Sequence, residues 1–208
     1  MIKTNSILFS YNAEKEFAFP SIDLSQGQQA LLIGASGSGK STYMNIIGGL
    51  NSNYKGELIV ANQNIGELSS SALDKFRGSK IGIIFQESNL VESLTLEQNL
   101  LLRLKLARKL KKEVEWDYLL DALKIKSLLK QMPKTLSIGE RQRANIALAL
   151  ITQPKVVLAD EPTSALDDQN ANQVIDLLKQ VSEALNTTLL IITHDNRVKD
   201  HFKNQVSL

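Results

Sequence analysis

Apolar and polar positions alternate along the first part of the chain, a pattern typical of strands with one buried face. Residues 6–11 and 16–19 follow it, so we expect two strands joined by a turn at Asn12-Ala13. Residues 21–24 are expected to extend the second strand. Further along, short apolar runs predict more strands, most of them buried, at residues 29–33, 57–60, 81–85, 156–159 and 188–193.

Between these runs the pattern changes to a helical period. A helix is expected after the glycine-rich stretch 34–42, through Gly48, and a short one at 72–76 with a serine N-cap at one of positions 69–71. Residues 169–185 predict an amphipathic helix. The leucine-rich segment 89–152 has no strand pattern, and its expected helices run from the Thr95–Gln98 capping box to about 112, within 113–132, and from 137 to about 152.

Composition narrows the classes of function. With 208 residues, 43% hydrophobic and 22% charged, the chain suits one sizeable domain or a core with a subdomain. A formal net charge of +2 is too small to predict nucleic acid as a partner. There is no cysteine, hence no disulfide or thiol chemistry. We find no signal-peptide core and no apolar run of about 18 residues, so any membrane role is expected to come through a partner.

The glycine-rich stretch 34–42 matches the phosphate-binding pattern G-x-x-x-x-G-K-[ST] between a predicted strand and a predicted helix, the context the motif requires. Its glycines let the backbone approach phosphate oxygens, and the helix start adds its positive end. A glycine- and serine-rich loop that matches by chance is the alternative. Lys40 is expected to reach the β- and γ-phosphates, and the Ser41 hydroxyl to bind Mg²⁺. The predicted ATP-binding residues here are Gly34, Ala35, Ser36, Gly37, Ser38, Gly39, Lys40, Ser41 and Thr42.

Polar residues end three of the predicted buried strands: Gln86, the pair Asp160-Glu161, and His194. Open α/β sheets bind ligands at the carboxyl ends of their strands. An apolar strand that ends in two carboxylates is the Walker B form, which delivers Asp160 to the metal and Glu161 to the attacking water. Each position alone is compatible with a plain strand end, but together they favour a functional site.

Two further features, an aromatic residue and a helix start, have a plain structural interpretation. We place the Tyr11 ring against an adenine base, although a half-buried strand tyrosine fits its spacing equally well. Ser137 and Glu140 form a capping box that leaves the N–H groups of a helix start facing outward. On its own this second pattern predicts a helix start and nothing more.

In this order, the features resemble the ATPase subunit of an ATP-binding cassette (ABC) transporter over essentially the whole chain. The signature before Walker B, with the histidine one strand later, makes the resemblance specific. Residues 44–50, 80–86 and 89–90 are similar to the lipoprotein-releasing, macrolide-exporting and cell-division branch. The matching features are the aromatic Tyr11, the Walker A loop 34–42, the Q-loop Gln86, the signature residues Leu136, Ser137, Ile138, Gly139 and Glu140, the Walker B residues Asp160 and Glu161, the D-loop Asp167 and the switch His194.

The resemblance implies an α/β fold with a P-loop NTPase (RecA-like) core, an N-terminal antiparallel β-subdomain and an inserted α-helical subdomain. It implies one ABC ATPase domain over residues 1–208. Within it, 1–87 would hold the β-subdomain and the first part of the core, 88–153 the helical subdomain with the signature, and 154–208 the rest of the core.

It also implies a mechanism with ATP and Mg²⁺. Two ATPase subunits, identical or different, would meet head to tail around two ATPs, with the signature of one chain on the γ-phosphate bound by the other. Glu161 would polarise the water and His194 would contact the γ-phosphate, with Lys40 as the third catalytic residue. Ser41, Gln86 and Asp160 would hold the metal. The helical subdomain would pass motion to integral permease-type subunits at the cytoplasmic face of the cell membrane.

The function expected is thus an ATP-hydrolysing subunit that powers an ABC-type transport complex for export or for lipoprotein or peptide extrusion. One alternative is a mechanotransmission ATPase that drives a membrane partner without transport. A DNA-repair ATPase head would need a long coiled coil before the signature, where no sustained heptads occur. Ile138 replaces the first of two glycines usual in the family, which leaves open a nucleotide-binding module without turnover. Its side chain could obstruct the partner's nucleotide or pack against the helical subdomain.

Overall fold

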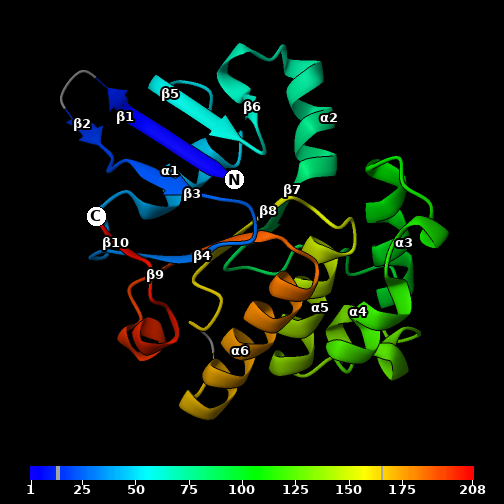
Figure 1. Cartoon of the computed structure of the whole chain (residues 1–208). Coiled ribbons are helices and arrows are strands. Elements are labelled where there is room, and N and C mark those ends of the chain that lie inside the picture. Colours follow the sequence, from blue (N-terminus) through cyan, green and yellow to red (C-terminus); the bar gives the residue numbers. More distant parts are fainter. Residues whose placement is uncertain (13–14, 165) are drawn as a thin grey trace.

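The computed structural model describes residues 1–12, 15–164 and 166–208, and its strands form two sheets. Figure 1 shows a parallel sheet across the middle, with an antiparallel sheet above it and most of the helices below. The strand order of the parallel sheet is β10-β4-β9-β8-β7. Its strands are β4 (Gln29–Ile33), β7 (Ile81–Ile84), β8 (Val156–Asp160), β9 (Thr188–Thr193) and β10 (Gln205–Ser207).

Both faces of the parallel sheet are covered, as the apolar runs predict, and every residue of β8 and β9 is buried. Side chains alternate along a strand, so Leu31 and Val157 face one hydrophobic cluster, while Leu32 and Leu158 face the other. The first cluster is shared with α3 to α6, and the second with α1 and the antiparallel sheet. The helices are α1 (Lys40–Ile47), α2 (Ser70–Lys80), α3 (Leu96–Leu106), α4 (Trp116–Ala122), α5 (Ile138–Leu150) and α6 (Asp168–Ala184).

The antiparallel sheet has the order β2-β1-β5-β6, with β3 paired to the start of β1. Residues 22–24 continue the second strand along β1 in the same register, but as a separate strand, because Pro20 between them cannot donate a ladder hydrogen bond. The predicted turn at Asn12-Ala13 lies at the edge of the described residues, and Ala13 lies outside them. The strands are β1 (Ile2–Asn12), β2 (Lys15–Ala18), β3 (Ile22–Leu24), β5 (Lys55–Val60) and β6 (Gln63–Asn64).

Helix positions agree with the sequence pattern, but several ends differ. The N-cap of α2 is Ser69, and the helix continues to Lys80, past the predicted end at 76. Helix α3 has the predicted Thr95 capping box but stops at Leu106, before the predicted 112, and Arg108 just beyond it adopts a left-handed φ of 56°. Only α4 and a 3₁₀ turn form within 113–132. The 3₁₀ turns are Ile65–Glu67, Lys111–Glu113, Lys126–Leu128, Pro133–Thr135 and Asn196–His201.

The arrangement determines where polar strand ends gather. Because β4, β7, β8 and β9 run parallel, the residues that follow them lie along one edge of the sheet. The phosphate-loop candidate follows β4, Gln86 follows β7, Glu161 follows β8 and His194 follows β9. Among the helices of the described residues, none is long and apolar enough to cross a membrane.

Candidate nucleotide-binding site

A cleft of about 410 Å³ opens at this edge of the parallel sheet. It brings together predicted residues from the first strand, the glycine-rich loop and the ends of three other strands, which are far apart in the sequence. Its lining residues are Tyr11, Phe17, Ser36, Gly37, Gly39, Lys40, Ser41, Thr42, Gln86, Glu161 and His194. The structure thus places most of the predicted binding and catalytic residues around one space.

The glycine-rich loop curls tightly in front of α1. Gly39, the N-cap of the helix, has a φ of 97°, and a Cβ there would lie 2.9 Å from the Phe17 ring. Lys40 is almost buried, and its Nζ donates hydrogen bonds to the carbonyl oxygens of Gly34 (2.9 Å) and Ala35 (2.7 Å). The ammonium is thereby held over the loop, where its charge can meet an anion bound by the loop N–H groups.

Asp160 ends β8 as a buried carboxyl group. Burial raises its pKa above the ordinary value, and the nearby Ser41 side chain and Lys40 ammonium offset this only in part. The Oδ1 atom of Asp160 has no hydrogen-bond partner among the described residues. A buried, unpaired carboxylate oxygen is unfavourable unless a cation or donor satisfies it, so Asp160 suits a metal ligand.

Glu161 lies beside the end of β9 and is held by three hydrogen-bonding contacts. Its Oε2 accepts a bond from the Thr193 hydroxyl at 2.6 Å. Its Oε1 accepts from the backbone N–H of His194 at 3.0 Å and pairs with the Nδ1 of the same residue at 2.6 Å. Register explains the contact, because Asp160 is paired with Ile192 and the next residues on each strand are therefore adjacent. Two of the three predicted catalytic residues, Glu161 and His194, are thus in direct contact.

Tyr11 and Gln86 complete the cleft. The Tyr11 hydroxyl is 2.6 Å from Thr42 Oγ1, and the Phe9 ring meets the tyrosine ring edge-on with centroids 4.6 Å apart. These contacts fix the ring, yet Tyr11 is 68% exposed. An exposed, fixed aromatic face suits stacking of a base better than it suits a half-buried strand tyrosine.

The signature residues lie apart from this cleft. Ser137 caps α5, with its N–H and hydroxyl donating to Glu140 at 2.9 and 2.8 Å. These hydrogen bonds lower the pKa of Glu140 below its ordinary value. Leu136 is buried, whereas Ile138 is 65% exposed at the start of the helix. Gly139 is open enough that an added Cβ would meet only Arg143, at 3.5 Å.

Asp167, the predicted D-loop residue, caps the next helix, α6. Its carboxylate accepts hydrogen bonds from the backbone and side chain of Asn170, at 2.9 and 2.7 Å, and these hold its pKa below the ordinary value. Neither Asp167 nor the signature lines the cleft. One chain therefore presents the glycine-rich loop with its acidic and histidine partners in one place and the signature in another.

Sequence reasoning missed three residues that shape the site. Phe17 lines the cleft and closes on Gly39, Thr193 binds Glu161, and Gln142 of the signature helix donates to the carbonyl of Pro162 at 2.8 Å. The sequence gives a weak indication of Phe17 and Thr193. Phe17 occupies an apolar position in a predicted alternating strand, and Thr193 directly precedes His194. The Gln142 contact joins segments twenty residues apart, and no local pattern predicts it.

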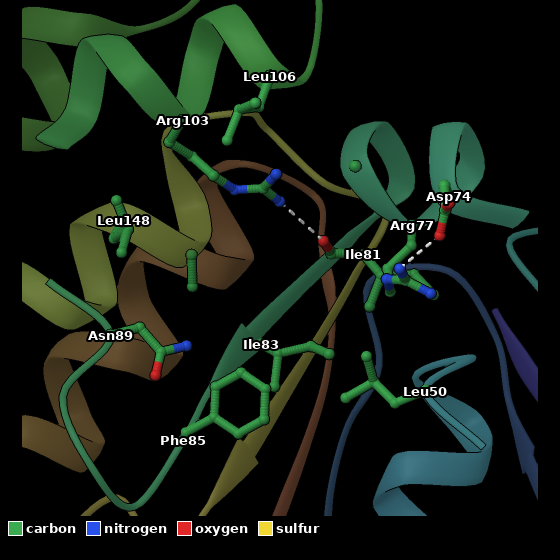
Figure 2. A pocket seen from close by; sticks show the side chains of 12 residues that line it. Leu50, Asp74, Arg77, Ile81, Ile83, Phe85, Asn89, Arg103, Leu106 and Leu148 are labelled. Carbon is green, nitrogen blue, oxygen red and sulfur yellow. Dashed lines mark hydrogen bonds and ion pairs between the residues drawn. The ribbon is translucent and has the colours of Figure 1, made fainter. Parts of the chain in front are cut away.

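A second cleft, of about 340 Å³, lies between α2, β7, α3 and α5 (Figure 2). Ile81, Ile83 and Phe85 line its floor, and Leu106 and Leu148 approach from the helical side. Arg103 crosses between the two parts, donating to the Ile81 carbonyl at 3.2 Å, and burial lowers its pKa from the ordinary value. Phe85 directly precedes Gln86, so this cleft adjoins the first one along the chain.

Comparison with known proteins supports the same class. Residues 19–164 match the family model described as ABC transporter. Over 175 residues the chain is 37% identical to the ABC transporter ATP-binding protein MG467 of Mycoplasma genitalium, a match that covers 84% of this chain but only 56% of that protein. Over 194 residues it is 38% identical to the lipoprotein-releasing system ATP-binding protein LolD of Treponema denticola, covering 91% and 86% of the two chains.

Solved structures of ATP-binding cassettes are similar to this chain over nearly its whole length. A dimeric, post-hydrolysis structure of the ATP-binding cassette MJ0796 with ADP and Pi has a TM-score of 0.85 at 32% identity, covering 100% of this chain and 94% of that one. CbiO1 of Clostridium perfringens, described as part of the transporter complex CbiONQ, has a TM-score of 0.87 at 26% identity, covering 99% and 83%.

The fold and cleft define a P-loop nucleotide-binding protein of the ATP-hydrolysing kind. The chain belongs to the ABC transporter family, as an ATP-binding and ATP-hydrolysing subunit. The predicted family and fold class are confirmed. The comparisons do not favour the mechanotransmission alternative.

Proposed function

We propose that the chain works in a pair of ATPase subunits and drives integral permease-type subunits from the cytoplasmic face of the membrane. The single observation that carries the catalytic part is the convergence of Lys40, Glu161 and His194 on one cleft. The separation of the signature from that cleft supports the pair, because only a second chain could bring Ser137 and Gly139 to the nucleotide. The dimeric MJ0796 cassette supports the same assembly.

ATP would bind with its adenine on Tyr11 and its phosphates in the loop 34–42. The exposed tyrosine face offers the stacking surface, and the loop N–H groups with the start of α1 offer the anion site. Lys40 would add its charge at the β- and γ-phosphates. The open space around Gly37, where an added Cβ would touch nothing within 4 Å, leaves room for close approach.

The residues present fit Mg²⁺. Asp160 offers an unpaired carboxylate oxygen, with the Ser41 hydroxyl beside it, and Gln86 faces the same cleft. No cluster of three or more acidic, histidine or cysteine residues suited to a metal occurs in 1–12, 15–164 or 166–208. That suits a magnesium ion, which binds through few protein ligands together with substrate phosphates. When bound, the ion would neutralise charge on the phosphates.

Glu161 would act as general base. It would accept a proton from water while the water oxygen bonds to the γ-phosphorus and the bond to the bridging oxygen breaks, with that electron pair leaving on ADP. His194 would move from Glu161 to the γ-phosphate; its side chain is 61% exposed and so has room to move. From the partner chain, the N–H groups at the signature helix start would hold the same phosphate.

For the cargo, we propose export or lipoprotein or peptide extrusion, on the basis of the LolD relative. For the membrane partner, the cleft of Figure 2 is the contact surface we favour. It combines apolar residues with Arg77 and Arg103, and it ends at Phe85 beside Gln86. Helices α3 to α5 would then transmit movement between that surface and the nucleotide.

The test is Glu161→Gln. The amide keeps the shape of the side chain but cannot act as a base. The variant should therefore bind ATP normally and hydrolyse it more slowly, by roughly 100-fold or more. It should also form an ATP-dependent dimer on size exclusion. Turnover at the parent rate would remove Glu161 from the catalytic role.

A further inference from the structure

Thr193 contacts Glu161 at the end of β9, and we propose that it is a positioning residue for the carboxylate during hydrolysis. The proposal rests on the proposed function, because it takes Glu161 as the base. Its support is the hydrogen-bond geometry around the two side chains, which no motif in the sequence predicts.

The direction of the Thr193 hydrogen bond is fixed by its neighbours. Thr193 is fully buried, and its Oγ1 accepts a hydrogen bond from the backbone N–H of Asp195 at 2.9 Å. A backbone N–H can only donate, so the one hydroxyl hydrogen is left for Oε2 of Glu161, 2.6 Å away. A β-branched side chain in a packed strand has a restricted χ1, so this donor is held rigidly.

The two oxygens of Glu161 therefore have different partners. Oε2 is bound by the buried Thr193, which cannot leave without unpacking the strand. Oε1 is bound by the backbone N–H and the imidazole of His194, whose side chain is 61% exposed. When the imidazole turns to a phosphate, a lone pair on Oε1 is released toward water while Oε2 stays anchored. Thr193 thus keeps the carboxylate oriented at the moment when its other side-chain contact is lost.

This anchoring matters because, once the imidazole has turned away, the contact left on Oε1 among the described residues is the single hydrogen bond from the backbone N–H of His194. The φ of Glu161, 48°, is left-handed, a conformation that surroundings must maintain in a residue other than glycine. The terminal torsion of a glutamate side chain is also broad. Without the Oε2 anchor the carboxylate can rotate away from the water, and a displacement of roughly 1 Å at a reacting group costs on the order of 100-fold in rate.

The experiment compares Thr193→Val, Thr193→Ser and the matched control Thr188→Val in the full chain, with Glu161→Gln measured in parallel. Thr188 is a buried threonine of the same strand, and its hydroxyl bonds Ser25 and Gly27 at the opposite end. The measurements are kcat and KM for ATP, and the melting temperature. Thr193→Val should lower kcat by roughly 10- to 100-fold with KM unchanged. Thr193→Ser should keep kcat and lose some stability, since it retains the hydroxyl but not the buried methyl.

Three results would overturn the proposal. Parent-like kcat in Thr193→Val shows that the hydroxyl does not orient the base. A folded Thr193→Ser variant with a kcat as low as that of Thr193→Val shows that retaining the hydroxyl does not retain the rate. A lower kcat, a changed KM and a lower melting temperature, to the same extent in Thr193→Val and Thr188→Val, show a general structural role. Full turnover by Glu161→Gln is a separate outcome, because it rejects the base itself and with it the proposed mechanism.

Discussion

Ile138→Gly tests the one signature position that departs from the family pattern. Ile138 is 65% exposed at the start of α5, so packing against the helical segment accounts for only a minor part of its surface, and the exposure favours the obstruction hypothesis over a packing role. The side chain projects at the helix end that would meet the partner's nucleotide. Since the N–H groups there must come within about 3 Å of the γ-phosphate, a branched side chain at that point can hold them off.

The expected magnitudes follow from exposure and geometry. About a third of Ile138 is buried, so removal of its side chain loses about 0.5–1 kcal/mol, a third of the roughly 1.5–3 kcal/mol that full burial provides. Glycine adds up to about 1 kcal/mol of helix destabilisation. The domain should tolerate this sum. If the obstruction shifts the helix start by roughly 1 Å, its removal should raise the ATPase rate of the self-paired form by up to about 100-fold.

The assay is steady-state ATP hydrolysis by the purified chain, with Glu161→Gln as the background. Ile138→Ala serves as the matched control, because it removes the branched group while keeping a good helix former. Both variants should be faster than the parent if obstruction limits the rate. Equal or lower activity in both, with melting temperatures that show folded protein, would reject the obstruction hypothesis.

Two further changes test the loop and the histidine segment. Gly39→Ala should lower the melting temperature without nucleotide more than Gly37→Ala. Gly39 and Gly37 both have left-handed φ values, of 97° and 77°, and such a conformation costs alanine about 1–2 kcal/mol. Of the two, the added Cβ would meet the Phe17 ring at Gly39 alone, at 2.9 Å. Equal melting temperatures of the two variants would contradict this steric argument. Hydrogen bonds from Arg197 hold the pKa of Asp195 at about 2, below the ordinary value near 3.9. This stabilisation is therefore present above about pH 4 and lost as the pH falls toward 2. In urea unfolding, Asp195→Asn should lower the free energy of unfolding at pH 7 and flatten its decline below about pH 4. An unchanged pH profile of the free energy of unfolding would count against the ion pair.

The positions of strands and helices were predicted with different success from local sequence patterns. Continuous apolar runs located β8 and β9 correctly, because a strand buried on both faces needs apolar residues throughout. The predicted end of α3 was wrong. The helix stops before Arg108, whose φ is left-handed, and neither a proline nor a glycine marks this stop in the sequence. The interruption between β2 and β3 lies at Pro20, a local feature, whereas the register that both strands share on β1 is seen only in the structure.

The sequence by itself determined the class of protein and predicted most of the residues that line the cleft. The phosphate loop is contiguous, and the polar residues that end buried strands can be placed at one sheet edge because parallel strands share a direction. Only the tertiary structure decided which side chains touch. Thr193 meets Glu161 because the register pairs Asp160 with Ile192, Phe17 of β2 lies against Gly39 at the start of α1, and Ile138 stays exposed. Such contacts depend on the packing of segments distant in the chain, and no short stretch of sequence specifies that packing.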